Sequence, residues 1–108
     1  MKNKIYQIAL TLIPNVGPVT ARNLVSYCGS PEAVFDTPEK ALLKIPGIGK
    51  RMCKYILNKE VLAKAEKELA FTEEHGIQVL FYLDQDYPTR LRPYPDSPVL
   101  LYYKGNTP

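Results

Sequence analysis

The sequence is poor in the residues that catalysis, metal binding and cross-linking use. Its 108 residues include no tryptophan, two cysteines and one histidine. Because His75 is the only histidine, no Ser/His/Asp or Cys/His arrangement is recognisable. Cys28 and Cys53 lie 25 positions apart with no second cysteine or histidine beside either, which is not the spacing of a zinc site or a redox pair. We therefore expect reduced cysteines, no metal, no cofactor and no enzymatic activity.

Long apolar runs are missing as well. Gln7 and Thr11 interrupt the apolar stretch near the N-terminus, and nothing approaches the roughly 20 apolar residues of a membrane span. Two acidic pairs occur, at residues 73–74 and at residues 84 and 86, but neither lies in a recognisable metal-binding loop. These absences predict a cytoplasmic protein without membrane contact, and they disfavour a metal-dependent nuclease.

Negative charge is scarce in one part of the chain. The formal net charge of +3 is modest, but residues 1–70 hold eleven Lys/Arg against six Asp/Glu, whereas residues 71–108 hold three against five. Residues 40–59 contain six Lys/Arg and no acidic residue. The local field of that stretch is therefore more attractive to a polyanion than the average of the chain.

An internal repeat with an offset of 32 residues is the clearest positive feature. Ile13–Leu24 (IPNVGPVTARNL) aligns with Ile45–Ile56 (IPGIGKRMCKYI), and each copy reads as helix, tight turn, helix. Apolar residues at helical spacing are predicted to face a shared core: Ala21, Leu24, Val25 and Cys28 in the first copy, and Cys53, Ile56 and Leu57 in the second. We expect a mainly α-helical tandem helix-hairpin-helix domain over residues 1–76.

Start and stop signals predict the remaining helices. Gly29 ends a helix, and Ser30–Pro31 and Thr37–Pro38 each pair a capping residue with a proline at the first helical position, which predicts two short helices. A longer helix is expected over residues 61–75, ended by Gly76. Its inward residues would be Leu62, Ala65, Leu69 and Thr72. The first helix of the chain would bury Ile5, Ile8, Ala9 and Leu12.

The pattern changes to strands after Gly76. Residues 77–83 and 99–103 are strand-like, residues 84–88 have turn composition, and Gly105-Asn106 closes the second strand. Two isolated strands do not stabilise themselves, and a continuous apolar run is normally buried on both faces. We expect residues 77–108 to be a β extension at which a larger sheet begins. Exposed strands there would also allow a homodimer.

The second hairpin has the composition of a phosphate site. Its glycines permit positive φ angles and a close backbone approach, and the N–H groups that open the next helix point outward at the positive end of its dipole. Such a helix start accepts a phosphate without reading a base. The predicted DNA-binding residues of this hairpin are Gly47, Ile48, Gly49, Lys50, Arg51 and Lys54.

The first hairpin is a weaker candidate for the same role. Asn15 replaces the first glycine, and Pro18 offers no N–H where the second copy has Lys50. Gly17 and Arg22 are retained as a weaker second DNA contact, with Arg22 at the position that Lys54 occupies in the other copy. The apolar turn residues, Val16 and Ile48, are expected to plug the core.

The later part of the chain resembles a known family. Two segments carry the resemblance: Asp86-Tyr87-Pro88-Thr89-Arg90-Leu91 and Ser97-Pro98-Val99-Leu100-Leu101-Tyr102-Tyr103-Lys104-Gly105-Asn106. Asp84 lies just before the first segment. Together with the repeat they resemble the DprA/Smf family of DNA-processing proteins. Members of that family carry an Asp-x-x-Tyr-Pro-x-x-Leu element and a Pro-x-x-Leu-(Tyr/Phe)-x-(Lys/x)-Gly element just before a Rossmann-like domain.

The resemblance implies a fold and a function. It implies a SAM-like helical domain at residues 1–76 and the start of an incomplete Rossmann-like domain at residues 77–108. It also implies a bacterial cytosolic protein that binds single-stranded DNA, protects incoming strands in natural transformation and helps to load the RecA recombinase. The principal single-strand pocket of the family would follow Asn106. Residues 1–108 would then act as an accessory or partner-binding region.

Two hypotheses of different classes stay open at this point. In one, the helix-hairpin-helix module contacts DNA phosphates without sequence preference, which the repeat and the basic stretch favour. In the other, it is a protein-interaction domain that docks a partner or packs on the rest of its own chain and has no DNA contact, which the modest net charge favours. His75 and the acidic pairs are expected to be solvated.

Overall fold

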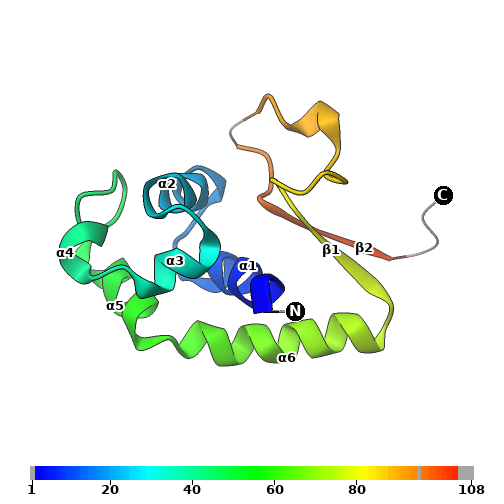
Figure 1. Cartoon of the computed structure of the whole chain (residues 1–108), viewed down its shortest axis with the longest axis horizontal. Helices are drawn as coiled ribbons and strands as arrows, with labels where there is room; N and C mark the ends of the chain where they lie inside the picture. Colours follow the sequence, from blue (N-terminus) through cyan, green and yellow to red (C-terminus); the bar gives the residue numbers. More distant parts are fainter. Residues whose placement is uncertain (1, 95, 105–108) are drawn as a thin grey trace.

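The chain folds into a helical module with a two-stranded ribbon at one end. The computed structural model describes residues 2–94 and 96–104, with side chains from residue 4 onward. Its elements in chain order are α1 (Lys2–Leu12), α2 (Pro18–Cys28), α3 (Pro31–Asp36), α4 (Glu39–Leu42), α5 (Lys50–Asn58), α6 (Glu60–Glu74), β1 (Ile77–Phe81), a 3₁₀ turn (Thr89–Leu91) and β2 (Leu100–Lys104). Figure 1 shows α4 and α5 at the end opposite the ribbon. The predicted mainly helical class is confirmed.

Helix α1 lies in the middle of the module. It packs along α6 and also contacts α3 and β2, so Ile8, Ala9 and Leu10 are fully buried. The sequence pattern placed Ile5 and Leu12 on the buried face and left Leu10 off it. Ile5 and Leu12 are instead half-buried, because neighbours on several sides enclose the centre of the helix more completely than its ends.

The two repeat copies form equivalent helix starts. Gly17 precedes α2 and Gly49 precedes α5, both in extended conformation. The equivalent residues Leu24 and Ile56 are completely buried in one core. The prediction for Leu57 is wrong, since 39% of it is exposed: α5 packs against α3, α4 and α6, and the position after Ile56 turns away from all three.

The two short helices between the copies are present as predicted, but one cap differs. The Ser30 hydroxyl accepts a hydrogen bond from the Ala33 N–H at 3.1 Å and caps α3 as expected. The Thr37 hydroxyl does not cap α4. It donates to the Ala33 carbonyl at 2.6 Å, and Pro38 stands at the N-cap position of α4. Thr37 therefore closes the helix before it.

Helix α6 follows its predicted course and ends as expected. Ala65 and Thr72 are buried, as is Val61, which the sequence pattern missed. The other two expected inward residues are half-buried: Leu62 and Leu69. Gly76 adopts φ +67°, a conformation in which glycine has no Cβ penalty, and the chain then enters β1.

The ribbon is a two-stranded antiparallel sheet in the part of the chain that the structure describes. Ile77 pairs with Lys104, and Phe81 pairs with Leu100. The first strand begins at the predicted residue and ends two residues early, whereas the second is shifted by one residue toward the C-terminus. Burial on both faces, expected for the second strand, is not found. Tyr102 and Tyr103 point to opposite faces of the strand and are 47% and 40% exposed, because burial along β2 falls from Leu100 toward Lys104. Gly105 and Asn106 lie outside the described residues.

Side-chain contacts hold the ribbon and its connecting loop to the helices. The Lys4 ammonium donates to the Asp84 carboxylate at 2.9 Å and to the Val79 carbonyl at 2.7 Å. Tyr87 is 1% exposed, and its hydroxyl donates to the Pro98 carbonyl across the loop, so it anchors the turn. These contacts, rather than the strand pairing alone, stabilise the extension. Its assignment to a separate Rossmann-like domain stays a prediction.

Candidate nucleic-acid interface

The turn of the second hairpin has the backbone that its sequence predicts. Gly47 adopts φ +87°, where an L side chain is strained. Ile48 is buried at 7% exposure and its N–H donates to the Ile45 carbonyl at 3.1 Å. The expectation that Ile48 plugs the core is confirmed. It therefore supports the turn from inside, and the part of the turn that faces solvent is glycine backbone.

Helix α5 begins with an open end. Its first intrahelical bond runs from the Cys53 N–H to the Gly49 carbonyl at 3.1 Å, and Gly49 provides no side-chain cap. The N–H groups of the first turn lack intrahelical acceptors, as in any α-helix. A Cβ placed on Gly49 would meet no described atom within 4 Å. The positive end of the helix dipole is thus accessible to an anion.

The predicted cations of this hairpin lie together on the surface. Lys50, Arg51 and Lys54 are exposed and line one surface hollow with Tyr55 and Asn58. The hollow lies along α5, a helix that Figure 1 shows at the end of the molecule opposite the ribbon. The structure therefore brings the charged residues of the predicted site together beside the open helix end, and adds two residues that the sequence reasoning did not select.

The turn of the first hairpin has a similar backbone and different surroundings. Asn15 adopts φ +68°, so it takes the left-handed conformation that Gly47 takes in the other copy. Pro18 occupies the first turn of α2. A second hollow borders this turn, and its lining comes from both the hairpin and the segment before β2: Thr11, Val16, Gly17, Pro18, Ala21, Pro98, Val99 and Leu100. The segment that leads into β2, residues 98–100, thus lies against the first hairpin.

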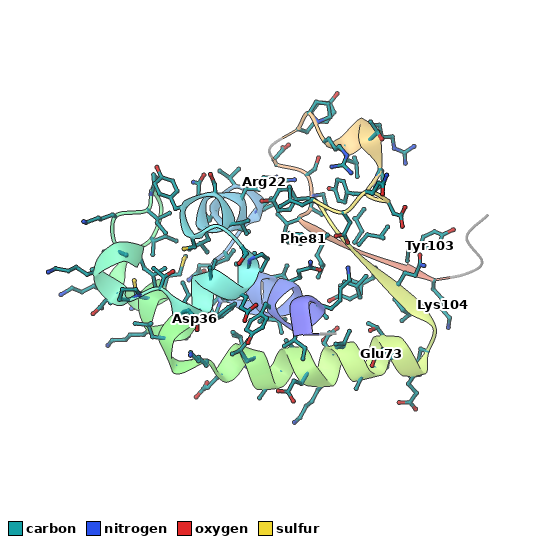
Figure 2. All side chains as sticks on the ribbon, in the orientation of Figure 1. Arg22, Asp36, Glu73, Phe81, Tyr103 and Lys104 are labelled. Atoms are coloured by element: carbon teal, nitrogen blue, oxygen red, sulfur yellow. The ribbon has the colours of Figure 1, made fainter. Side chains whose placement is uncertain are left out.

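Arg22 makes contacts within the chain. Its guanidinium donates to the Ser97 carbonyl at 2.7 Å, and its Cζ lies 4.8 Å from the centroid of the Tyr82 ring, a distance typical of a cation–π contact. Figure 2 shows Arg22 on the side of α2 that faces the ribbon. Its expected role as a second DNA contact stays a prediction, and the geometry gives it a structural role that the sequence reasoning missed.

Tyr82 shows the electrostatic effect of this contact. Burial raises the pKa of its phenol, and the nearby Arg22 charge lowers the pKa by a smaller amount, so the net shift is upward. Nothing in the local sequence signals the pair, because Arg22 and Ser97 are 75 positions apart and neither belongs to a motif that contains the other.

The histidine, one of the acidic residues and one of the cysteines, for which no catalytic role is expected, make contacts within the chain or are buried. His75 is exposed as expected and stacks on Phe71 with 4.1 Å between ring centroids. Asp84 departs from the expectation of a solvated carboxylate, because it is half-buried, pairs with Lys4 and accepts the Phe81 N–H. Both cysteines are free thiols, and burial raises the pKa of Cys53, with a further increase from Glu39. Among residues 2–94 and 96–104 no three His, Cys, Asp or Glu side chains gather as metal ligands. None of the described helices has the length and apolarity needed to cross a membrane.

The geometry defines a tandem helix-hairpin-helix module, with two glycine-containing turns that each open a helix. Residues 8–59 match the family model of the SAM-like helix-hairpin-helix tandem, so the chain contains such a domain over these residues. No curated protein matches the chain and no solved structure matches it. The helix-hairpin-helix fold is typical of DNA-binding domains, and its presence is consistent with nucleic-acid binding in general.

Proposed function

We propose that the chain binds nucleic-acid backbone without sequence preference, through the second hairpin. The observation that carries this proposal is the hollow on α5, where three exposed cations lie beside the uncapped helix start at Gly49. Backbone N–H groups at a helix start and clustered Lys/Arg side chains are the two recurrent means by which proteins hold phosphates. Neither reads a base, so the binding would be nonspecific.

The charges of this surface set the expected strength of binding. Each cation that neutralises a phosphate releases condensed counterions, so the logarithm of the affinity falls linearly with the logarithm of salt concentration. Lys50, Arg51 and Lys54 together would contribute about three units of that slope at most. A weak interaction that is sensitive to salt follows, as suits an accessory contact within a larger DNA-binding protein.

We place this contact in a protein of the DprA/Smf kind. The support is the order of the motifs: the repeat, then Asp84 to Leu91, then Ser97 to Tyr103. The two later segments are also hydrogen-bonded to each other, because the Tyr87 hydroxyl donates to the Pro98 carbonyl; the Tyr87 N–H in turn donates to the Asp84 carbonyl. The proposed role is the binding of single-stranded DNA in the cytoplasm, with assistance to RecA loading in natural transformation and no catalysis.

The alternative role, that of a protein-interaction domain, is favoured only at the first hairpin. The first hairpin packs on the rest of its own chain, with Arg22 on Ser97 and Pro98 against the turn. A partner that used this surface would have to displace residues 98–100. We therefore assign the interaction role, in its intramolecular form, to the first hairpin only.

Fluorescence anisotropy of labelled oligonucleotides tests the proposal. The chain and a Lys50→Ala/Arg51→Ala/Lys54→Ala variant are titrated at low and moderate salt, with a variant carrying alanine at Lys64, Lys67 and Lys104 as the control for lost charge. We expect binding that weakens with salt, is largely lost in the hairpin variant and is retained in the control. Equal loss in both variants, or no binding of the wild-type chain at low salt, would contradict it.

A further inference from the structure

An aromatic residue lines the hollow on α5 together with the three cations. Tyr55 packs against the hydrophobic core with part of its side chain and also lines the hollow. Together with the aliphatic stems of the surrounding lysines and arginine, it makes the lining more apolar than polar. A bare phosphate needs only the cations. An aromatic ring beside clustered cations suits a ligand that has a flat apolar group next to an anion.

The start of α5 and the Tyr55 side chain are separated along the helix axis. Lys50 opens α5 and Asn58 ends it, which gives a span of about 12 Å at the rise of an α-helix. Tyr55 lies five residues beyond Lys50, about 7.5 Å along the axis. A phosphate held at the start of the helix would therefore leave Tyr55 and Asn58 beside the neighbouring part of the same nucleotide chain. Their position is that of a base or sugar.

We propose that Tyr55 is a stacking platform for an unpaired base, and that Arg51 and Asn58 flank that base in the hollow. The proposal rests on the single-strand and phosphate binding proposed above and adds to it a specific residue that contacts a base. Bases in a duplex are stacked on one another and present only their edges in the grooves, whereas a single strand can turn the face of a base toward an aromatic ring. The site therefore favours single-stranded nucleic acid.

The neighbours of Tyr55 fit this role. Its packing against the core fixes the ring before a ligand arrives, which lowers the entropic cost of stacking. Asn58 uses its side-chain oxygen to accept the Glu60 N–H at 2.9 Å, so the amide nitrogen, which carries two donor hydrogens, is oriented by that bond. Arg51 precedes Tyr55 by one helical turn, and a guanidinium can stack on the same base.

A comparison of oligonucleotides of equal charge tests the base site separately from the phosphate site. The full chain is titrated at low salt with labelled oligothymidylate and with an oligomer of the same length whose residues are abasic. We expect the wild-type chain to bind oligothymidylate at least about fivefold more tightly, as stacking of one base gives. Tyr55→Phe keeps the ring and should retain this preference. Tyr55→Leu keeps an apolar side chain in the core and should bind both oligomers equally.

The possible outcomes distinguish the two proposals. Equal affinity of the wild-type chain for both oligomers, with binding still dependent on Lys50, Arg51 and Lys54, would overturn the base site and leave the phosphate contact standing. No binding of either oligomer would overturn both. If Tyr55→Leu proves unfolded by circular dichroism, the wild-type ratio between the two oligomers alone decides. Tighter binding of an acidic tyrosine-containing peptide than of oligothymidylate would also count against the proposal, since it assigns the hollow to a protein partner.

Discussion

The two hairpins have the same backbone conformation at their turns but differ in the residues that surround them. In each, a residue with positive φ is followed two positions later by an extended glycine that opens a helix: Asn15 and Gly17 in the first copy, Gly47 and Gly49 in the second. The first turn borders a hollow that Pro98 and its neighbours share, whereas the hollow of the second is lined by α5 alone. Repetition of a fold thus fixes the core, whereas the surface side chains and the surroundings of the two copies differ.

The cations at equivalent positions of the two hairpins, Arg22 and Lys54, differ in their contacts. Arg22 and Lys54 are 32 residues apart, the offset of the repeat. Arg22 bonds to Ser97 and lies over Tyr82, whereas Lys54 is exposed beside Lys50 and Arg51. A planar guanidinium suits the first setting, because it combines a directed hydrogen bond with a ring contact. An ammonium on a flexible stem suits a diffuse contact with phosphate.

The largest expected effect concerns what the hairpins share. Leu24→Ala and Ile56→Ala remove equivalent, completely buried side chains, and each should lower the free energy of unfolding by about 2–5 kcal/mol. Urea denaturation followed by circular dichroism measures both. The equivalence of the two copies in the core would be disproved by a loss below about 1 kcal/mol in one variant and a large loss in the other.

The next effect should separate the two copies. Arg22→Ala removes a charged hydrogen-bond donor and a ring contact, so a loss of about 2 kcal/mol in unfolding free energy is expected. Lys54→Ala removes an exposed side chain and should change stability by less than about 0.5 kcal/mol. The same denaturation experiment gives both values. A loss for Arg22→Ala as small as that expected for Lys54→Ala would contradict a stabilising contact of Arg22 with Ser97 and Tyr82.

A smaller effect is expected at the turns. Gly47→Ala forces an alanine into positive φ with its Cβ 3.6 Å from the Thr20 hydroxyl oxygen, which should cost about 1 kcal/mol. The control is Gly17→Ala, at φ −93° with no described atom within 4 Å of the new Cβ, and its effect should be near zero. A thermal melt of each variant compares them. A similar Tm for both would contradict the strained turn.

The smallest expected effect is a dependence of stability on pH caused by Tyr82, the residue whose ring contacts Arg22 of the first hairpin. Because the pKa of Tyr82 is raised from its ordinary value of 10.0 in the folded chain, the unfolded chain loses the phenol proton first. The associated stability is complete below pH 10 and is lost as the pH rises through the folded pKa. Tyr82→Phe should therefore lose less stability than the wild type between pH 9 and pH 11, measured by urea denaturation at each pH. Parallel curves for the two proteins would contradict the shift.

The sequence predicted what local patterns encode. The offset of 32 residues located both turns, and the identity of Asn15, Gly29 and Gly76 correctly marked positions of positive φ. Clustering of the cations on α5 followed from helical spacing, since residues 50, 51 and 54 lie within about one turn. Tyr55 and Asn58 continue the same spacing, one turn beyond Arg51 and Lys54, and could have been found by extending it.

The features that were missed depend on contacts between distant segments. Burial of Leu10 and exposure of Leu57 depend on which helices pack against α1 and α5, and helical periodicity alone does not specify the neighbours. The turn at Lys59, which has φ +60° without being glycine, has no Gly or Pro signal. Arg22 is the only cation of the first hairpin, which is why the sequence suggests a DNA contact there, and only the folded chain brings Ser97 and Tyr82 against it.

The central claim is that the second hairpin binds nucleic acid while the first binds its own chain. Chemical-shift mapping tests it most directly, by titrating the ¹⁵N-labelled chain with unlabelled oligothymidylate at low salt. We predict shifts in the amide signals of residues 47–58, with those of residues 15–24 and the Ser97 amide unchanged. Shifts of comparable size at both hairpins, or shifts confined to the first hairpin and the ribbon, would contradict the claim.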